Sequence, residues 1–262
     1  MAIGYSEAVP PRSVRTKDFY PYTQITEISI MNTFSKTLLA GALMSVTGLA
    51  TAEISGNVSL ASDYMWRGIS QTDNQLSVSG GLDYGHESGF YLGTWAGNVN
   101  FGPGDPSMEL DVYGGFAGEM GAIGYDVGVI GYLYPSADEI NTTEFYVGGS
   151  YGFTDAVSAG LKFYYTSDYF GTSESAYRVE GSVDVGLPED FGLSLAVATN
   201  DGDAFDPNVT GLTDYMDYSV GLSKSMWDLD FGLSYIDTNL SESECGSNIC
   251  DGRVVFSVAK SL

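Results

Sequence analysis

Apolar residues alternate with small or polar ones along most of the chain from residue 54 to its end. In the first such segment Ile54, Val58 and Leu60 share one face, while Ser55 and Asn57 lie on the other. A period of two predicts a strand with one apolar side. Twelve segments show this pattern, and most have the length of a tilted membrane-spanning strand. Their ranges are 54–67, 76–86, 90–100, 108–118, 122–133, 144–152, 156–166, 175–186, 192–200, 214–223, 228–238 and 253–261.

The connections between these segments alternate in length. The short ones are 87–89, 119–121, 153–155, 187–191 and 224–227. The long ones are 68–75, 101–107, 134–143, 167–174, 201–213 and 239–252. Outer-membrane barrels have short periplasmic turns and long extracellular loops, whereas a secreted β-sandwich has no reason to alternate them. The sequence therefore predicts an all-β, closed antiparallel transmembrane β-barrel of twelve strands. An even strand number places both termini in the periplasm.

The apolar face of each strand should contact lipid, and the small polar face should line the lumen. An open sheet edge cannot survive in a bilayer, so the strands must close into a barrel. Aromatic side chains are expected on the lipid side at both membrane interfaces. Those at the loop-side strand ends are Tyr64, Trp66, Tyr165 and Tyr177, and those near the turns are Tyr84, Phe90, Phe116 and Tyr125.

The first part of the chain has the features of an export signal. Lys36 precedes an apolar run over 38–49, and Ala50-Thr51-Ala52 is a small-x-small cleavage site. The run has about 12 residues, too few for a membrane anchor. We therefore expect 1–30 to be a start-site overcall outside the fold, 31–52 to be a signal peptide and 53–262 to be the outer-membrane barrel.

Composition excludes several functions. The net charge is −24, which repels phosphate, so nucleic acid is excluded as a partner. An aromatic content of 13% argues against disorder. The single histidine, His86, excludes a His pair or a three-His metal site, and we expect no cofactor. An exported barrel of this kind belongs in the outer membrane of a Gram-negative bacterium, in contact with lipid and lipopolysaccharide.

Thirteen charged residues are expected on the lumen face. The acids are Asp63, Asp83, Glu109, Asp111, Asp126, Glu180, Asp184, Asp217 and Asp230, and the bases are Arg67, Lys162, Arg178 and Arg253. One interpretation is a negative potential that favours cations during passive diffusion of small solutes. The other is a network of salt bridges that fills and stiffens a narrow barrel.

Two details of these lumen charges can be tested. Arg67 is expected to pair with Asp63 or with a cross-strand acid at the mouth of the first strand. Asp111 and Asp126 fall on neighbouring strands and are expected near mid-height, where a constriction would form. Their replacement by asparagine should then weaken a cation preference.

The last long loop contains both cysteines, Cys245 and Cys250. In an oxidising compartment a disulfide is the default, and Cys-x4-Cys is a weak metal motif. Asp201-Gly202-Asp203 with Asp206 resembles a calcium loop but lacks EF-hand spacing. We expect no metal site there, but a solvated loop bridged by divalent ions to lipopolysaccharide.

The run 62–73 reads SDYMWRGISQTD, and GGLDY follows at 80–84. Further runs are 86–91, 109–115, 125–128 and 255–261. Together they resemble TorF-family porins of proteobacteria over essentially all of 53–262. The resemblance implies an outer-membrane porin. That family tends to end in Phe, whereas this chain ends in Leu262, which weakens recognition by the barrel-assembly machinery.

Two other classes of function compete with a porin. An outer-membrane enzyme would need a histidine beside a nucleophile or an activated water, and His86 lies in a predicted turn without an evident partner. We therefore do not expect an enzyme. A non-conducting structural or adhesin-type barrel has the same sequence pattern as a porin. Conductance measurements separate the two, and the oligomeric state is left open.

Overall fold

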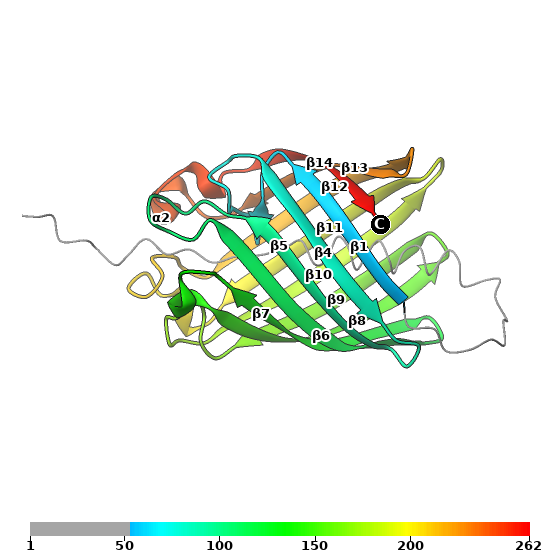
Figure 1. Cartoon of the computed structure of the whole chain (residues 1–262), viewed down its shortest axis with the longest axis horizontal. Helices are drawn as coiled ribbons and strands as arrows, with labels where there is room; N and C mark the ends of the chain where they lie inside the picture. Colours follow the sequence, from blue (N-terminus) through cyan, green and yellow to red (C-terminus); the bar gives the residue numbers. More distant parts are fainter. Residues whose placement is uncertain (1–52) are drawn as a thin grey trace, which may run out of the picture.

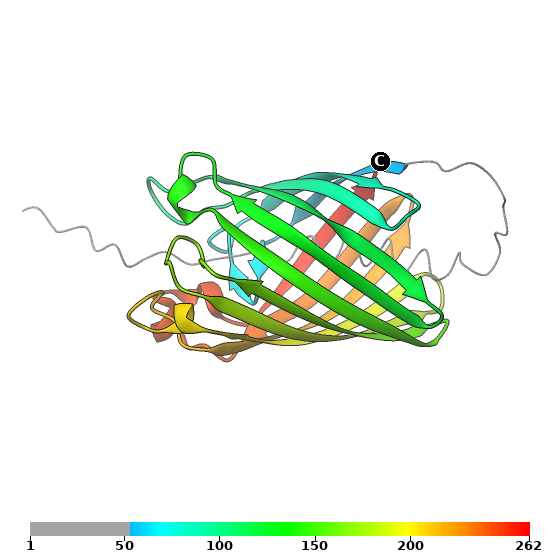
Figure 2. The same ribbon diagram turned by 90° about the horizontal axis from the view of Figure 1, so that it is seen from below.

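The computed structural model describes residues 53–262, and the expectations for 1–30 and 31–52 fall outside the described residues. Twelve tilted antiparallel strands form a closed barrel (Figures 1 and 2). They are β1 (Glu53–Ala61), β4 (Ser77–Gly85), β5 (Phe90–Asn98), β6 (Met108–Met120), β7 (Ile123–Leu133), β8 (Thr142–Thr154), β9 (Val157–Thr166), β10 (Ala176–Leu187), β11 (Phe191–Asp201), β12 (Tyr215–Met226), β13 (Leu229–Thr238) and β14 (Arg253–Ser261).

Each strand pairs with its neighbour along the chain, and β1 closes the barrel against β14. The closing register places Asn57 opposite Ser261 and Ala61 opposite Ser257. On its other side β1 pairs with β4, so two short strands, β2 (Met65–Trp66) and β3 (Ile69–Ser70), are left out of the wall. The predicted closed, twelve-stranded antiparallel barrel is confirmed.

The two ends of the barrel differ in their connections. The long loops gather at the end that carries α2 (Glu242–Cys245), which we call the loop end (Figure 1). These loops also contain the 3-10 helices η1 (Asp138–Ile140), η2 (Asp203–Phe205) and η3 (Asn248–Cys250). The C-terminus lies at the opposite end with the short turns, which we call the turn end.

The outer surface of the barrel is apolar. Leu82 and Leu233 are 62% and 50% exposed, as are many other aliphatic side chains along the strands. Aromatic pairs lie on the same side at both ends, including Phe116 with Tyr125 and Phe163 with Tyr177. In water such a surface would be unfavourable, whereas in lipid it is the surface a membrane barrel presents. No helix of residues 53–262 is long and apolar enough to cross a membrane.

The prediction for the first strand is wrong beyond residue 61. The strand was expected to continue to Arg67 with Tyr64 and Trp66 facing lipid, but β1 ends at Ala61 and both aromatic residues are buried. Arg67 and Gly68 have positive φ values of 45° and 83°. Two such residues make the tight hairpin that joins β2 to β3. The alternation therefore continues, but on a ribbon that folds into the barrel.

The orientation of the barrel in the membrane gives one testable prediction. A cysteine introduced at Asp203, in a long loop, should react with an impermeant thiol reagent on intact cells, because long loops are extracellular. A cysteine at Glu119, at the turn end, should react only after lysis. Both variants need Cys245 and Cys250 replaced by serine. Labelling at Glu119 but not at Asp203 would invert the orientation.

Candidate functional site in the barrel interior

The interior has two halves of different character. Toward the turn end the inward-facing residues are mostly glycine and serine, as at Gly192 and Gly232. Ser150, Ser194 and Ser223 are exposed although they lie in phase with inward-facing residues of their strands. Water therefore reaches the lumen from the turn end. We call this half the vestibule.

Toward the loop end the interior is filled by a plug, which we define as residues 62–75. Its ribbon of β2 and β3 lies inside the barrel (Figure 2). Trp66 and Gln71 are 0% exposed, and the plug aromatics pack with Trp95, Tyr132 and Phe170. Near-complete burial means that water does not reach these side chains, so the plug blocks this part of the lumen.

Polar contacts hold the first part of the plug to two separate parts of the wall. Asp63 accepts a hydrogen bond from Arg253 of β14 at 3.1 Å, and its other oxygen accepts from Ser70 and Thr72 of the plug itself. Four strands away from β14 around the barrel, β6 contributes Glu109, which accepts a hydrogen bond from the Tyr64 hydroxyl at 2.7 Å. Strands distant in sequence thus bind the same short segment.

Arg67, at the tip of the ribbon, forms the most buried ion pair. Its Nη2 lies 2.7 Å from Oε2 of Glu144 on β8, and the two side chains are 3% and 2% exposed. The guanidinium also stacks on Trp66, with Cζ 4.1 Å from the ring centroid. Arg67 therefore pairs with an acid of the wall and not with Asp63. A side chain at Gly68 would collide with Thr238, which shows how closely the tip fits.

A second buried cluster joins β10, β11 and β12. Arg178 lies 2.6 Å from Glu180 and 2.5 Å from Asp217, and it also donates to Asn200. Asn200 in turn donates to Asp217 at 2.8 Å. The Arg178 guanidinium thus forms ion pairs with two carboxylates, which would repel each other in its absence.

A third pair lies below the plug, at the border of the vestibule. Lys162 Nζ is 3.3 Å from Asp126, and both side chains are partly exposed. Tyr91 donates to the same carboxylate at 2.6 Å, and the Tyr91 and Tyr146 hydroxyls are hydrogen-bonded. The ammonium also lies over the Tyr146 ring. This layer combines charge with aromatic surface.

The remaining predicted lumen acids also face inward but have other surroundings. Asp83 accepts a hydrogen bond from Tyr113, and Asp230 accepts one from Ser225. Glu109 accepts a hydrogen bond from Tyr134 in addition to the one from Tyr64. Asp184 faces the vestibule from β10 and is partly exposed. All thirteen predicted residues thus lie on the inner side of the barrel, although Asp63 and Arg67 do so on the plug and not on a strand.

Asp111 and Asp126 do not share one height, contrary to expectation. Asp111 is opposite Tyr132 in the β6–β7 register, whereas Asp126 is opposite Ala117, nearer the turn end. Asp111 is 0% exposed and lies in the plugged half, and neither of its carboxylate oxygens has a hydrogen-bond partner among the described residues. The β6–β7 hairpin explains the difference, because Asp126 lies close to the connecting turn and Asp111 lies much farther from it along its own strand.

Sequence reasoning missed Glu144, the acid that binds Arg67. The predicted strand began at this residue, yet its side chain was not assigned to a face. Glu144 is in phase with Tyr146, and both are buried inside the barrel. Extending the alternation by two residues from Tyr146 toward the start of the strand would have placed Glu144 on the inner face. Its inclusion raises the named lumen acids to ten, against four bases, and Glu53 and Glu119 at the turn end are in phase with them.

Two features bear on catalysis. His86 lies exposed in the turn between β4 and β5, where Nδ1 contacts the Ser88 hydroxyl at 2.8 Å. The residues 148–152 spell G-x-S-x-G, but Ser150 lies within β8 and not at a strand-to-helix turn. The sequence has no other histidine to activate this serine.

The loops at the loop end carry the disulfide and many acids. Cys245 and Cys250 are bonded to each other and buried. Asp206 accepts two hydrogen bonds from Asn208, and these lower the pKa of its carboxyl group. Within residues 53–262 no group of three or more His, Cys, Asp or Glu side chains could hold a metal ion.

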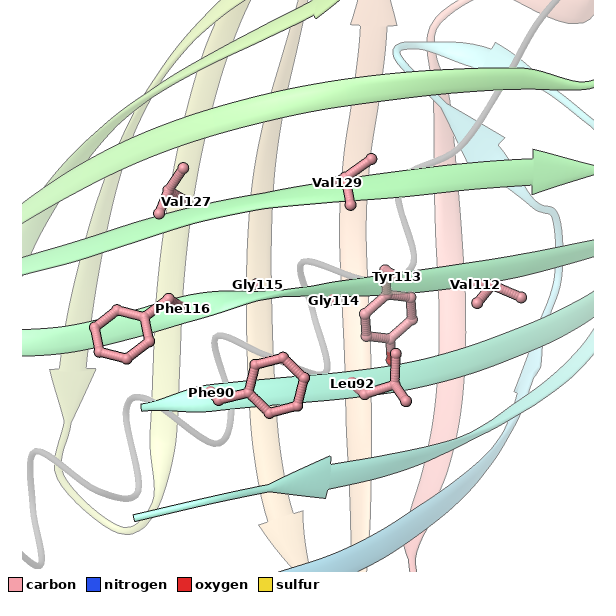
Figure 3. Close-up of a pocket in the computed structure, with 9 residues that line it drawn as sticks. All are labelled: Phe90, Leu92, Val112, Tyr113, Gly114, Gly115, Phe116, Val127 and Val129. Carbon is pink, nitrogen blue, oxygen red and sulfur yellow. The ribbon is translucent and has the colours of Figure 1, made fainter. Parts of the chain in front are cut away.

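An apolar hollow lies on the outside of the barrel. Leu92, Val112 and Phe116 surround Gly114 on neighbouring strands (Figure 3). The side chains of all three are exposed on the outer surface. The hollow therefore faces lipid and is separate from the lumen.

Comparison with known families identifies the chain. A family model described as a bacterial protein of unknown function, Gcw_chp, matches residues 46–262. The chain belongs to the Gcw_chp family. Membership of the TorF family stays a prediction. No curated protein matches this Gcw_chp member.

Solved structures with the same fold are outer-membrane porins. The KdgM porin superposes with a TM-score of 0.53 at 12% identity, covering 80% of this chain and 98% of that one. A KdgM porin in complex with disordered oligogalacturonate gives 0.54 at 12%, covering 81% and 99%. The NanC porin gives 0.53 at 12%, covering 79% and 98%. At this identity the likeness establishes the fold.

The closed barrel and its apolar exterior establish where the protein lies. Every strand of the wall is paired with a neighbour on both sides, which is what a bilayer requires of a spanning sheet. Single-chain barrels of this form, with the porin fold, belong to the outer membrane of Gram-negative bacteria. This Gcw_chp protein is therefore an outer-membrane β-barrel.

Proposed function

We propose that the protein is an outer-membrane channel for passive diffusion of small solutes, with a weak preference for cations, and that it is not an enzyme. The observation that carries this proposal is the polar, water-accessible vestibule inside a closed barrel with a porin fold. The resemblance of run 62–73 to TorF-family porins supports it. In this channel the plug sets how much of the lumen conducts.

The charge of the inner face supports the cation preference. At least ten acids face inward against four bases in the described chain, and each base has at least one acidic partner. Asp83 and Asp184 form no ion pair within residues 53–262. Fixed negative charge concentrates cations in the lumen. A polyanion such as the oligogalacturonate named with KdgM would be repelled by this interior.

The cation preference predicts a specific response to neutralisation of the vestibule. In planar bilayers with a salt gradient, Asp83→Asn combined with Asp184→Asn should move the reversal potential toward zero. The shift should be larger near 0.01 M than near 1 M salt, because the screening length falls from about 30 Å to about 3 Å. Glu242→Gln, on an exposed loop, is the matched control and should leave the potential unchanged. An anion preference of the parent protein would contradict the charge argument.

The packed plug favours one competing function, a non-conducting structural or adhesin-type barrel. A channel and a non-conducting barrel differ in whether the plug can leave the lumen. If the parent protein and a plug-weakened variant such as Arg67→Ala are both silent in bilayers while correctly folded, the channel proposal is rejected. Heat-modifiable migration in electrophoresis establishes folding in each case.

A further inference from the structure

The loop 239–252 lies directly against the plug. Its η3 segment is next to β3, and Leu240 and Ile249 pack on the same buried cluster as Trp66. The Asn248 side chain accepts a hydrogen bond from Asn74 of the plug at 2.9 Å. The end of the plug is therefore tied to Asn248, a loop residue 174 positions later in the chain.

Arg253 links the same loop to the start of the plug. Its Nη2 donates to the Asn248 carbonyl at 2.6 Å, while its Nη1 donates to Asp63 at 3.1 Å. Asn248 thus contacts the plug directly through Asn74 and indirectly through Arg253. Both ends of the plug depend on the position of one loop residue.

The disulfide determines the shape of this loop. Cys245 and Cys250 close a ring that includes Asn248, with Cα atoms 6.3 Å apart. Both cysteines are buried, and the Cys250 carbonyl accepts a hydrogen bond from Thr238 at the end of β13. Before the ring, Ser241 and Glu244 form a capping box that begins α2. Covalent closure restricts the conformations available to Asn248.

We infer that loop 239–252 is a latch that holds the plug in the barrel, and that the Cys245–Cys250 disulfide keeps the latch in shape. This inference deepens the proposed channel function and rests on it. Without the disulfide, the loop gains conformational freedom and Asn248 leaves the position from which it contacts Asn74 and Arg253. The plug then exchanges more often into a displaced state, and the lumen opens.

Two measurements on the Cys245→Ser/Cys250→Ser double variant test the latch. Hydrogen–deuterium exchange of residues 62–75 should accelerate about tenfold, because the plug loses hydrogen bonds of ordinary strength. Channel open probability in planar bilayers should rise by a similar factor. Glu242→Ala, on the same loop but without a side-chain contact to the plug, is the matched control and should match the parent. Heat-modifiable migration checks that each barrel is folded.

A second variant restores the latch by another bond. In the double-serine background, Asn74→Cys with Asn248→Cys joins the two side chains that are hydrogen-bonded in the structure. Oxidation removes two electrons and two protons from the thiols to form the disulfide, and it should return exchange and open probability to parent values. A dithiol reductant should reverse this.

The outcomes separate the latch from the channel. Unchanged exchange in the double-serine variant, with a folded barrel, overturns the latch even if Arg67→Ala conducts. Faster exchange at 62–75 with no conductance in any variant supports the latch and rejects the channel. If the double-serine variant does not fold, unchanged exchange in Asn74→Ala overturns the latch.

Discussion

Replacement of Arg67 by alanine should open the barrel. The guanidinium is buried against Glu144 and Trp66, and it is the only base within 4 Å of that carboxylate in the described chain. Its removal leaves the Glu144 charge buried, with the Tyr132 hydroxyl donating to it at 2.9 Å but no cation to balance it. Loss of one partner of a buried pair costs about 3–5 kcal/mol.

This cost falls on the plugged state, because Glu144 is hydrated when the plug leaves. At about 1.4 kcal/mol for each factor of ten, the ratio of plugged to unplugged barrels should fall by about a hundredfold or more. Single-channel recordings of Arg67→Ala should show long openings that the parent protein lacks. Adding Glu144→Ala should restore part of the block, because both buried charges are then absent. Unchanged conductance in a folded Arg67→Ala barrel would contradict the plug's role.

Replacement of Arg178 by alanine should destabilise the barrel but open the lumen less than Arg67→Ala does. Arg178 lies between Glu180 and Asp217, and all three side chains are largely buried. Without the guanidinium, the buried Glu180 and Asp217 carboxylates lose the cation that they share. The expected loss is about 3–5 kcal/mol in the free energy of unfolding, because both charges lose their partner.

Urea unfolding in detergent, followed by tryptophan fluorescence, measures this loss. Lys162→Ala is the matched control, since its pair with Asp126 is longer and partly exposed. Pairs of that kind contribute about 1 kcal/mol or less. Arg178→Met combined with Glu180→Gln and Asp217→Asn should recover much of the stability. Equal unfolding midpoints for Arg178→Ala and the parent would show that the cluster does not stabilise the barrel.

The architecture of the wall follows from local features of the sequence. The alternation of apolar and polar residues is visible from adjacent positions in the sequence alone. It predicted which residues of β4 to β14 face inward and which face outward. Short turns and long loops are likewise properties of the chain between strands. Because lipid permits no unpaired sheet edge, these local patterns together allow one solution, a closed barrel. Inward-facing charges such as Arg178 and Asp217 could therefore be named from the sequence, whereas their pairing could not.

The plug was decided by tertiary contacts. Residues 62–67 continue the alternation of β1, so the period alone predicts a longer strand through Tyr64 and Trp66. The chain leaves the wall because Asp63 binds Arg253, Tyr64 binds Glu109 and Arg67 binds Glu144. These partners lie on strands far away in sequence, and they meet only after the barrel closes. Local alternation determines which way a side chain points, but only the folded interior determines whether its segment belongs to the wall or to the lumen.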